Sequence, residues 1–315
     1  MKELYPLTGV VPIVNTPFTE DDTLDVASLE RLLEEGIADG VSGFIVPAVA
    51  SEVAKLTPDE RHDYVREVLR IVAGRVTVVA GASDPDMRRS RALAEDAVAL
   101  GVDGVLCAVP VPLIEDHDGA VDYFREVARA GMPMLMIQDL HWGGYGMARY
   151  TLMQLWDELE SFRCLKLETV PSGAKTSELI DATDDRLTIG CGWSLPQFIE
   201  ALDRGTHFTT TTAINRPFVH VFRLHRAGRR DEARELFHRV VPFLAFAHQY
   251  IDISIHFYKR YCVRRGLFAT ARVREPIMPF DAHHARVADE LIELICEIEN
   301  ELGPAGGEPP ADMYM

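Results

Sequence analysis

A short apolar segment with two charged residues points most directly to chemistry. In Cys164-Leu165-Lys166-Leu167-Glu168 the side chains should alternate as in a β-strand, so Lys166 and Glu168 share one face. Lysine is rarely buried unless it is paired or functional. A lysine removed from water loses its proton more readily and can then attack a carbonyl carbon. We therefore take Lys166 as a candidate nucleophile and Glu168, about 6.6 Å further along the strand, as a candidate proton carrier.

Structural roles are the alternative for both charged residues. Lys166 could reach solvent at the end of its strand, and Glu168 could form an ordinary salt bridge or a hydrogen bond to a loop. The two catalytic roles also conflict, because an ionised carboxylate favours the ammonium form of a neighbouring lysine. A protonated Glu168, or one held by another partner, would remove this conflict.

A second candidate acid or base lies at the end of another apolar run. Asp139 comes two residues after Ile137, so the two should share a face, and Gln138 should face the other way unless the strand twists. A carboxylate there could act as a general acid or base, or simply begin a turn. The following loop, residues 140–146, is rich in glycine and contains His141, Trp142 and Tyr145. It is consistent with a lid, an aromatic wall for an apolar substrate, or a plain flexible connection.

The elements that must position these residues follow a regular pattern. Eight apolar runs predict strands, at residues 9–15, 43–48, 76–81, 104–109, 134–138, 164–168, 187–190 and 207–212. Amphipathic stretches predict helices near residues 25–39, 58–73, 86–100, 118–130, 150–160, 172–183, 195–204 and after residue 216. This alternation is typical of an α/β fold of the (β/α)8 TIM-barrel type, in which catalytic groups lie at strand ends. A doubly wound sheet would want a glycine-rich turn after its first strand, which is absent.

The pattern also predicts the limits of the domains. We expect the barrel over residues 1–225, a C-terminal helical extension over residues 226–302, and a disordered tail over residues 303–315. Thr57, Pro58 and Glu60 predict a helix start with a capping box.

Two further positions could contact a ligand. Gly190 would let a ligand approach the backbone at the end of the seventh strand. Four threonines, residues 209–212, form most of the eighth strand, and Thr211 is our candidate among those that point inward. Threonine also simply favours strands, so this evidence is weak.

The composition narrows the class of protein. The formal charge of -17, from 49 acidic and 32 basic residues, argues against binding to nucleic acid or to an anionic membrane. There is no apolar run of the ~18 residues that a membrane span needs, and the first residues do not resemble a signal peptide, so we expect a cytoplasmic protein. Five cysteines are scattered singly, which predicts neither a disulfide framework nor a metal site. We find no nucleotide-binding motif.

Several segments, in order along residues 6–300, resemble the dihydrodipicolinate synthase / N-acetylneuraminate lyase family of class I aldolases. They are Gly9-Val10-Val11-Pro12-Ile13-Val14-Asn15-Thr16-Pro17-Phe18, Leu56-Thr57-Pro58-Asp59-Glu60-Arg61, Gly101-Val102-Asp103-Gly104-Val105-Leu106, and Lys166 on the sixth predicted strand. The resemblance implies a TIM barrel, a metal-independent covalent imine on Lys166 with no other cofactor, a small carbonyl substrate, and a homodimer or homotetramer.

The sequence also departs from the family pattern. The family's Gly-Thr-Thr-Gly-Glu segment, which holds the substrate carboxylate, is replaced by Ala48-Val49-Ala50-Ser51-Glu52. The family's proton-relaying tyrosine on the fifth strand lines up with Ile137, and the arginine that follows lines up with Trp142. The tyrosine pair after the fourth strand, which joins the active sites of a dimer, lines up with Val111 and Pro112. The usual proton relay and much of the carboxylate clamp are therefore absent.

We accordingly expect a Schiff-base lyase or aldolase acting on a 2-oxo acid or related carbonyl compound, and not a true dihydrodipicolinate synthase. In this interpretation Lys166 forms the imine, Glu168 or Asp139 moves the proton, and Ser51 with backbone amides receives the acidic end of the substrate. The remaining candidate substrate contacts are Val49, Ala50, Ile137, Gln138, Trp142, Gly190 and Thr211. The alternatives are an imine-dependent dehydratase or decarboxylase, and a barrel that binds a metabolite without chemistry.

Overall fold

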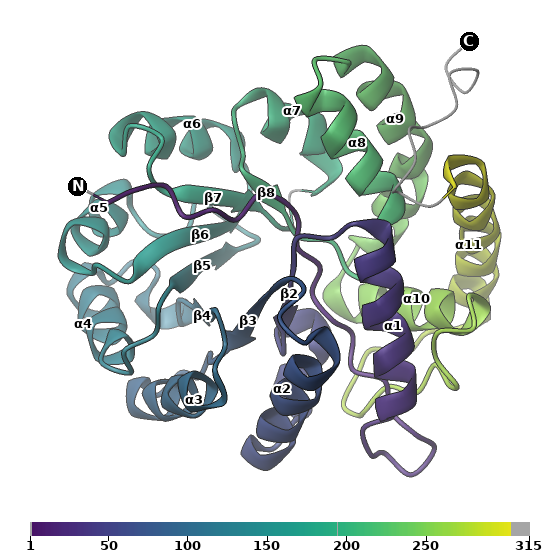
Figure 1. The fold of residues 1–315 in the computed structure, drawn as a ribbon, viewed down its shortest axis with the longest axis horizontal. Helices are drawn as coiled ribbons and strands as arrows, with labels where there is room; N and C mark the ends of the chain where they lie inside the picture. The colour runs from purple at the N-terminus through teal and green to yellow at the C-terminus, as the bar shows by residue number, and fades with distance from the viewer. Residues whose placement is uncertain (1, 194, 304–315) are drawn as a thin grey trace. The chain divides into compact units, whose positions relative to one another are not determined.

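The structure is a computed structural model that describes residues 2–193 and 195–303 of the 315-residue chain. Strands and helices alternate along the chain, and additional helices follow at the C-terminal end (Figure 1). The chain divides into two compact units: Thr77–Thr210 with the N-terminal residues up to Thr8, and Gly9–Val76 with the residues from Thr211 onward.

The first unit is built on six parallel strands that pair in chain order. They are β3 (Thr77–Gly81), β4 (Gly104–Ala108), β5 (Leu135–His141), β6 (Phe162–Thr169), β7 (Thr188–Cys191) and β8 (Phe208–Thr209). The helices between them are α3 (Met87–Leu100), α4 (His117–Ala128), α5 (Arg149–Glu158), α6 (Gly173–Ala182) and α7 (Phe198–Asp203), with short 3-10 turns at Val111–Leu113 and Leu195–Gln197. Nearly all residues of these strands are buried, as expected for parallel strands covered by helices.

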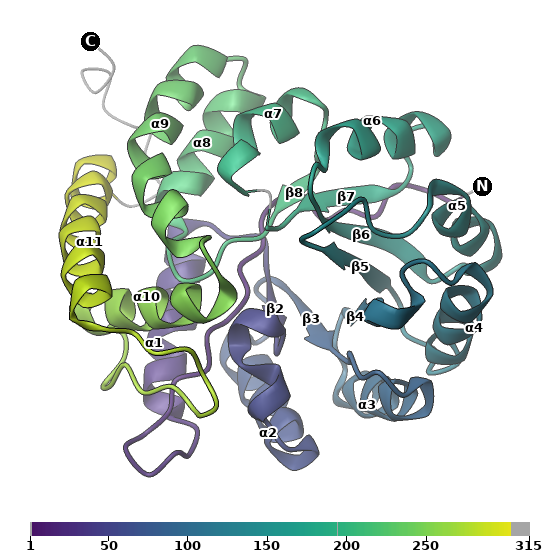
Figure 2. The same ribbon diagram turned by 180° about the vertical axis from the view of Figure 1, so that it is seen from behind.

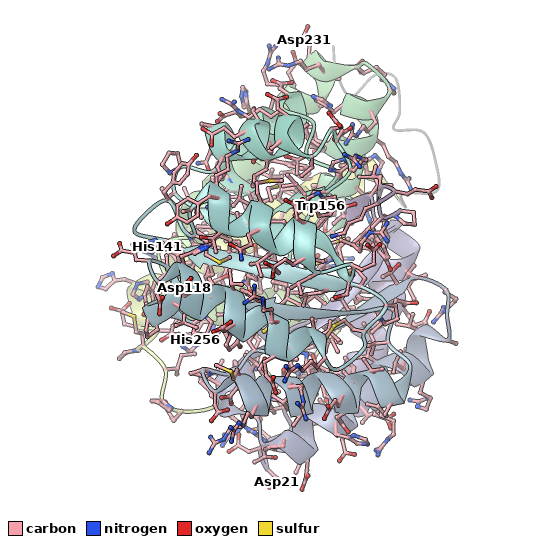
Figure 3. All side chains as sticks on the ribbon, turned by 90° about the vertical axis from the view of Figure 1, so that its left-hand side faces the viewer. Asp21, Asp118, His141, Trp156, Asp231 and His256 are labelled. Carbon is pink, nitrogen blue, oxygen red and sulfur yellow. The ribbon has the colours of Figure 1, made fainter. Side chains whose placement is uncertain are left out.

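Strand β5 leads directly into the glycine-rich loop that the sequence predicted. His141 is the last residue of β5, and α5 begins at Arg149. Figure 3 shows His141 near the start of α5 and Trp156 near its end. Helix α5 therefore connects the end of β5 to the start of β6, as the helix of a βαβ unit does.

The second unit contains the first two strands and the C-terminal helices. Its elements are β1 (Gly9–Val10), β2 (Gly43–Val46), 3-10 turns at Val49–Ser51 and Val53–Lys55, α1 (Val26–Asp39), α2 (Pro58–Val72), α8 (Arg216–Arg226), α9 (Arg230–Ala247), α10 (Ile251–Arg264) and α11 (Ala282–Leu302). An isolated parallel bridge joins Ile13 to Ile45. Helices α8 to α11 pack together in both views (Figures 1 and 2).

The start of α2 confirms the predicted capping box. The backbone N–H of Glu60 donates to Thr57 Oγ1 (3.2 Å), and the N–H of Thr57 donates to Glu60 Oε2 (2.8 Å). Pro58 occupies the first turn, where its missing N–H leaves no hydrogen bond unmade.

The order of eight strands and their helices, followed by further C-terminal helices, is that of the expected (β/α)8 barrel. The first and last strands are shorter than predicted, with two residues each. The predicted tail from residue 304 onward lies outside the described residues. Among the described residues, none of the helices is long and apolar enough to cross a membrane.

Candidate active site

Lys166 and Glu168 form a buried ion pair on β6. Lys166 Nζ lies 2.8 Å from Glu168 Oε2, and the exposed fractions of the two residues are 1% and 5%. They share a face because they are two residues apart on a strand. A buried ion pair costs more in desolvation than it returns unless further hydrogen bonds support it, so the partners of Glu168 decide what this pair can do.

Glu168 has two partners besides the lysine. Its Oε1 accepts a hydrogen bond from the backbone N–H of Trp193 (2.8 Å), and its Oε2 accepts one from Gln138 Nε2. Gly192 leaves room for this carboxylate, because a Cβ at that position would lie 2.0 Å from Glu168 Oε1. The carboxylate is thus held by other partners, which is one of the two conditions that would let it stand beside a nucleophilic lysine.

The register of β5 and β6 places Gln138 next to Lys166. The strands pair Gln138 with Lys166, and β7 pairs Gly190 with Lys166 on the other side. Residues paired across parallel strands face the same side, so Ile137 and Asp139 share a face as expected, and this face is opposite to that of Lys166. The register could not be read from the sequence, because it shifts between Leu135 and Met136.

Asp139 therefore belongs to a different cluster. Its Oδ2 accepts a hydrogen bond from Lys175 Nζ of α6 (2.5 Å), and its Oδ1 accepts one from the N–H of Met147 (2.9 Å). Lys175 also donates to the carbonyls of Tyr145 (2.7 Å) and Met147 (2.6 Å), and both charged side chains are fully buried. Burial raises the pKa of Asp139, although Lys175 opposes this, and burial lowers the pKa of Lys175. The pair anchors the loop after β5, and the predicted acid–base role of Asp139 stays a prediction.

Two tryptophans come together between the loops after β5 and β7. The rings of Trp142 and Trp193 have centroids 4.7 Å apart and planes inclined by 31°. Trp193 also supplies the N–H that holds Glu168. The contact of Trp142 with substrate stays a prediction. Trp193 adds a second aromatic ring beside Trp142, in the loop that contacts Glu168.

Gly190 is explained by packing within the first unit. A Cβ at this position would lie 2.2 Å from the ring of Phe208 on β8. This contact alone requires glycine, so the residue type carries no evidence for a ligand.

The remaining predicted contacts lie in the second unit. The Ser51 hydroxyl donates to the carbonyl of Val14 (2.5 Å) and accepts from the N–H of Ala48 (3.0 Å), within the turn that contains Val49 and Ala50. The Thr211 hydroxyl donates to Asn215 Oδ1 (2.7 Å). These bonds stabilise local structure, and the predicted substrate contacts of all four residues stay predictions.

Glu52, the residue after this turn, lies in a buried charged cluster. It accepts hydrogen bonds from Lys259 Nζ, from Lys55 Nζ (3.1 Å) and from the N–H of Arg274 (3.0 Å). Burial lowers the pKa of Lys259 to about 8, although Glu52 opposes this shift. The cluster joins the Val53–Lys55 turn to α10 and the segment that follows it.

The sequence interpretation missed three features that shape the site, namely Gln138 as the neighbour of Lys166, Trp193 and Lys175. Only Lys175 had a usable signal. It lies four residues before Leu179 on α6, at the spacing of a buried helix face. The other two depend on strand register or on a loop.

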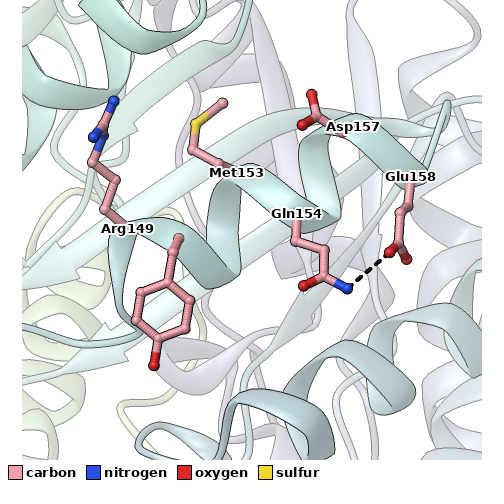
Figure 4. Close-up of a pocket in the computed structure, with 6 residues that line it drawn as sticks. Arg149, Met153, Gln154, Asp157 and Glu158 are labelled. Carbon is pink, nitrogen blue, oxygen red and sulfur yellow. Dashed lines mark hydrogen bonds between the residues drawn. The ribbon is translucent and has the colours of Figure 1, made fainter.

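The described part of the chain also has surface hollows outside this site. One lies along α5 and is lined by Arg149, Tyr150, Met153, Gln154, Asp157 and Glu158, with Gln154 Nε2 donating to Glu158 Oε1 at 2.8 Å (Figure 4). It includes none of the predicted site residues. Over residues 2–193 and 195–303, no group of three or more His, Cys, Asp or Glu side chains could hold a metal ion.

The sequence is similar to one known protein family and to individual proteins. The sequence model of the dihydrodipicolinate synthetase family matches residues 6–294. A 4-hydroxy-tetrahydrodipicolinate synthase of Methanococcus maripaludis is 28% identical over 240 residues, which cover 76% of this chain and 82% of that protein. An uncharacterized DapA-like lyase of Rhizobium meliloti is 29% identical over 209 residues, covering 66% and 68% of the two chains.

Solved structures agree on the fold. The crystal structure of dihydrodipicolinate synthase from Rhodopseudomonas palustris superposes with a TM-score of 0.84 at 24% identity, covering 93% of this chain and all of that one. A monomeric dihydrodipicolinate synthase variant gives a TM-score of 0.83 at 19% identity, covering 91% and 96% of the two chains. The fold is therefore the (β/α)8 TIM barrel with additional C-terminal helices.

Proposed function

Because this chain belongs to the dihydrodipicolinate synthetase family, we propose that it is a Schiff-base-forming carbon–carbon lyase acting on a pyruvate-like 2-oxo acid or a related carbonyl compound. Membership in the family supports a class I aldolase-like lyase that uses a lysine and no metal cofactor. The observation that carries the proposal is the ion pair of Lys166 with a Glu168 carboxylate that Gln138 and Trp193 hold in place.

In the proposed reaction, Glu168 first takes a proton from the Lys166 ammonium group. The neutral amine attacks the substrate carbonyl, and loss of water leaves a protonated imine. The imine withdraws electrons from the adjacent carbon, where a proton or a carbon substituent can then leave as an electrophile. Glu168 carries the proton because it is the carboxylate within ion-pair distance of Lys166 among the described residues, whereas Asp139 is bound to Lys175.

The substrate is expected to differ from that of a true dihydrodipicolinate synthase. The family's hydroxyl-bearing segment is replaced by Val49 and Ala50, and Trp142 occupies the position of its arginine. The neighbouring rings of Trp142 and Trp193, inclined to each other by 31°, favour a substrate with a flat or apolar part. Ile137 carries no weight in this proposal, because its pairing with Leu165 turns it away from Lys166.

Product analysis tests this function. The protein is incubated with pyruvate and a panel of aldehydes, and separately with hydroxylated 2-oxo acids, and the products are identified by mass spectrometry. We expect formation or cleavage of a carbon–carbon bond by the wild-type protein and a loss of roughly 10³-fold or more in Lys166→Met, because the covalent step disappears. Equal turnover in Lys166→Met would contradict the proposal. Release of only water or carbon dioxide would support the dehydratase or decarboxylase alternative.

A further inference from the structure

Gln138 has a buried acceptor that nothing in the described chain satisfies. The residue is 1% exposed, and its Nε2 donates to Glu168 Oε2. Its Oε1 has no hydrogen-bond partner among the described residues. Native proteins satisfy nearly all buried polar atoms, because an unpaired acceptor loses its hydration without compensation. An acceptor left open in a free enzyme therefore points to a donor that arrives with the ligand.

The orientation of the amide follows from its neighbour. An ionised carboxylate only accepts hydrogen bonds, so Gln138 must present its NH2 group to Glu168. Exchanging the amide O and N atoms would bring two acceptors together and would not relieve the open oxygen. The other oxygen of Glu168, Oε1, accepts a hydrogen bond from the N–H of Trp193. The carbonyl oxygen of Gln138 is thus fixed away from the carboxylate.

Gln138 lies beside the residue that carries the nucleophile. Gln138 and Lys166 are paired across β5 and β6. Gln138 Nε2 and Lys166 Nζ contact the same atom, Glu168 Oε2, which lies 2.8 Å from Lys166 Nζ. A molecule bound covalently to Lys166 would therefore bring its first atoms near the side chain of Gln138.

We propose that Gln138 Oε1 accepts a hydrogen bond from the hydroxyl group of the carbinolamine that forms when Lys166 adds to the substrate carbonyl, which makes Gln138 a catalytic residue of imine formation. This inference rests on the proposed function. Addition forms the C–N bond, and the carbonyl oxygen becomes a hydroxyl by taking a proton from the nitrogen. The protonated Glu168 then gives its proton to that oxygen, the C–O bond breaks, and water leaves as the nitrogen lone pair forms the C=N bond.

Gln138 contributes by orienting the hydroxyl in this step. When the hydroxyl hydrogen points to Gln138 Oε1, a lone pair of the same oxygen is free to accept the proton from Glu168. Glu168 returns to its ionised form, so protons and charge balance over the step without a further reactant. An amide cannot relay a proton, so this role differs from that of a tyrosine.

The test compares two reactions of the same amine. Wild-type protein and Gln138→Met are mixed with pyruvate, quenched with borohydride at increasing times, and analysed by intact mass. In parallel, both are treated with cyanate, which carbamoylates a neutral amine without expelling water. We expect imine formation in Gln138→Met to be roughly 10- to 100-fold slower, as for loss of one oriented hydrogen bond. Carbamoylation of Lys166, measured by peptide mapping, should fall clearly less than imine trapping, because both reactions lose the hydrogen bond to Glu168 but no hydroxyl departs in carbamoylation.

Two results of this comparison would overturn the inference. Equal trapping rates in the two proteins would show that the open oxygen has no part in imine formation. A parallel fall in trapping and carbamoylation would show that Gln138 acts only through Glu168 and Lys166. Absence of any adduct in the wild-type protein across a panel of carbonyl compounds would instead refute the proposed function itself.

A structural measurement covers the case in which Gln138→Met does not fold. Wild-type crystals soaked with pyruvate should place an oxygen atom, either the hydroxyl or the released water, within hydrogen-bond distance of Gln138 Oε1. Carbon atoms alone against this oxygen would overturn the proposal.

Discussion

The contacts of Glu168 support the proposal that this carboxylate and Lys166 act together. The carboxylate accepts hydrogen bonds from Gln138 and from the N–H of Trp193 in addition to its ion pair with Lys166. These donors stabilise the negative charge of Glu168 independently of Lys166. When Lys166 loses its proton, the buried carboxylate therefore still has hydrogen-bond partners. The sequence identified both charged residues, but the two donors come from another strand and from a loop.

Gly192 tests the placement of Glu168 at the residue scale. In Gly192→Ala the new Cβ would lie 2.0 Å from Glu168 Oε1, so the carboxylate must move and its hydrogen bond to Trp193 must break. We expect the rate of imine trapping with pyruvate to fall by roughly 10²-fold or more, because displacement of about 1 Å at a reacting group has that effect.

Gly143→Ala is the matched control for this prediction. A Cβ at Gly143 would meet nothing within 4 Å. Its trapping rate should stay within about twofold of the wild type, since surface substitutions of this kind change little. A Gly192→Ala variant as fast as Gly143→Ala would show that the observed position of Glu168 is not needed.

At the scale of elements, the sequence predicted what local residue patterns determine. The apolar runs located the strands of the first unit, and Thr57 with Glu60 located the start of α2. The register between β5 and β6 was not predictable, because strand pairing depends on neighbours distant in the sequence. That register moved Asp139 from the expected catalytic face to a contact with Lys175, and it brought Gln138 to the lysine.

The Asp139–Lys175 pair tests how the loop after β5 is held. Lys175→Met should destabilise the protein by about 3–5 kcal/mol, because it leaves the Asp139 carboxylate buried without its cation. Hydrogen exchange at the N–H of Met147, which donates to Asp139, should accelerate relative to the core strands. Chemical unfolding and hydrogen-exchange mass spectrometry measure the two effects.

The double variant Asp139→Leu/Lys175→Met controls for the buried charge. It removes both charges and should be less destabilised than Lys175→Met alone. If the double variant is the less stable of the two, the cost comes from lost packing, and the assignment of an electrostatic anchor is wrong.

At the scale of the whole molecule, the class of fold followed from the alternation of strands and helices, and the solved structures of the family confirm it. The assembly into dimers or tetramers stays a prediction. One of the similar solved structures is a monomeric dihydrodipicolinate synthase variant. Val111 is 75% exposed in this chain, so it has surface available for a contact between copies. Light scattering over a range of concentrations would determine the assembly state.

Glu299 on α11 should make the stability of the protein depend on pH. Burial raises its pKa from 4.5 to about 7, although Arg265 and Tyr261 oppose the shift. The folded state therefore binds the Glu299 proton more tightly than the unfolded state does. The stability that this proton contributes is fully present below pH 4.5 and is lost as the pH rises through 7. Relative to Glu299→Gln, the free energy of unfolding of the wild type should fall by up to about 3 kcal/mol across this range.

Glu293→Gln is the control on the same helix. Glu293 is exposed, and its hydrogen bond to Arg264 lowers its pKa, so any stability it contributes is present above pH 4.5 and changes only below that pH. Denaturant titrations at pH 5, 6, 7 and 8 would compare the three proteins. Parallel curves for the wild type and Glu299→Gln would contradict the role given to burial of Glu299.

The most direct test of the central claim is the position of the trapped adduct. Wild-type protein is incubated with pyruvate, reduced with borohydride and digested, and the modified peptide is sequenced by mass spectrometry. We predict one adduct on Lys166 and none on Lys175, the other buried lysine of the same unit that is paired with a carboxylate. A protein that stays unmodified across a broad panel of carbonyl compounds, or that is modified at any lysine but Lys166, would contradict the imine mechanism.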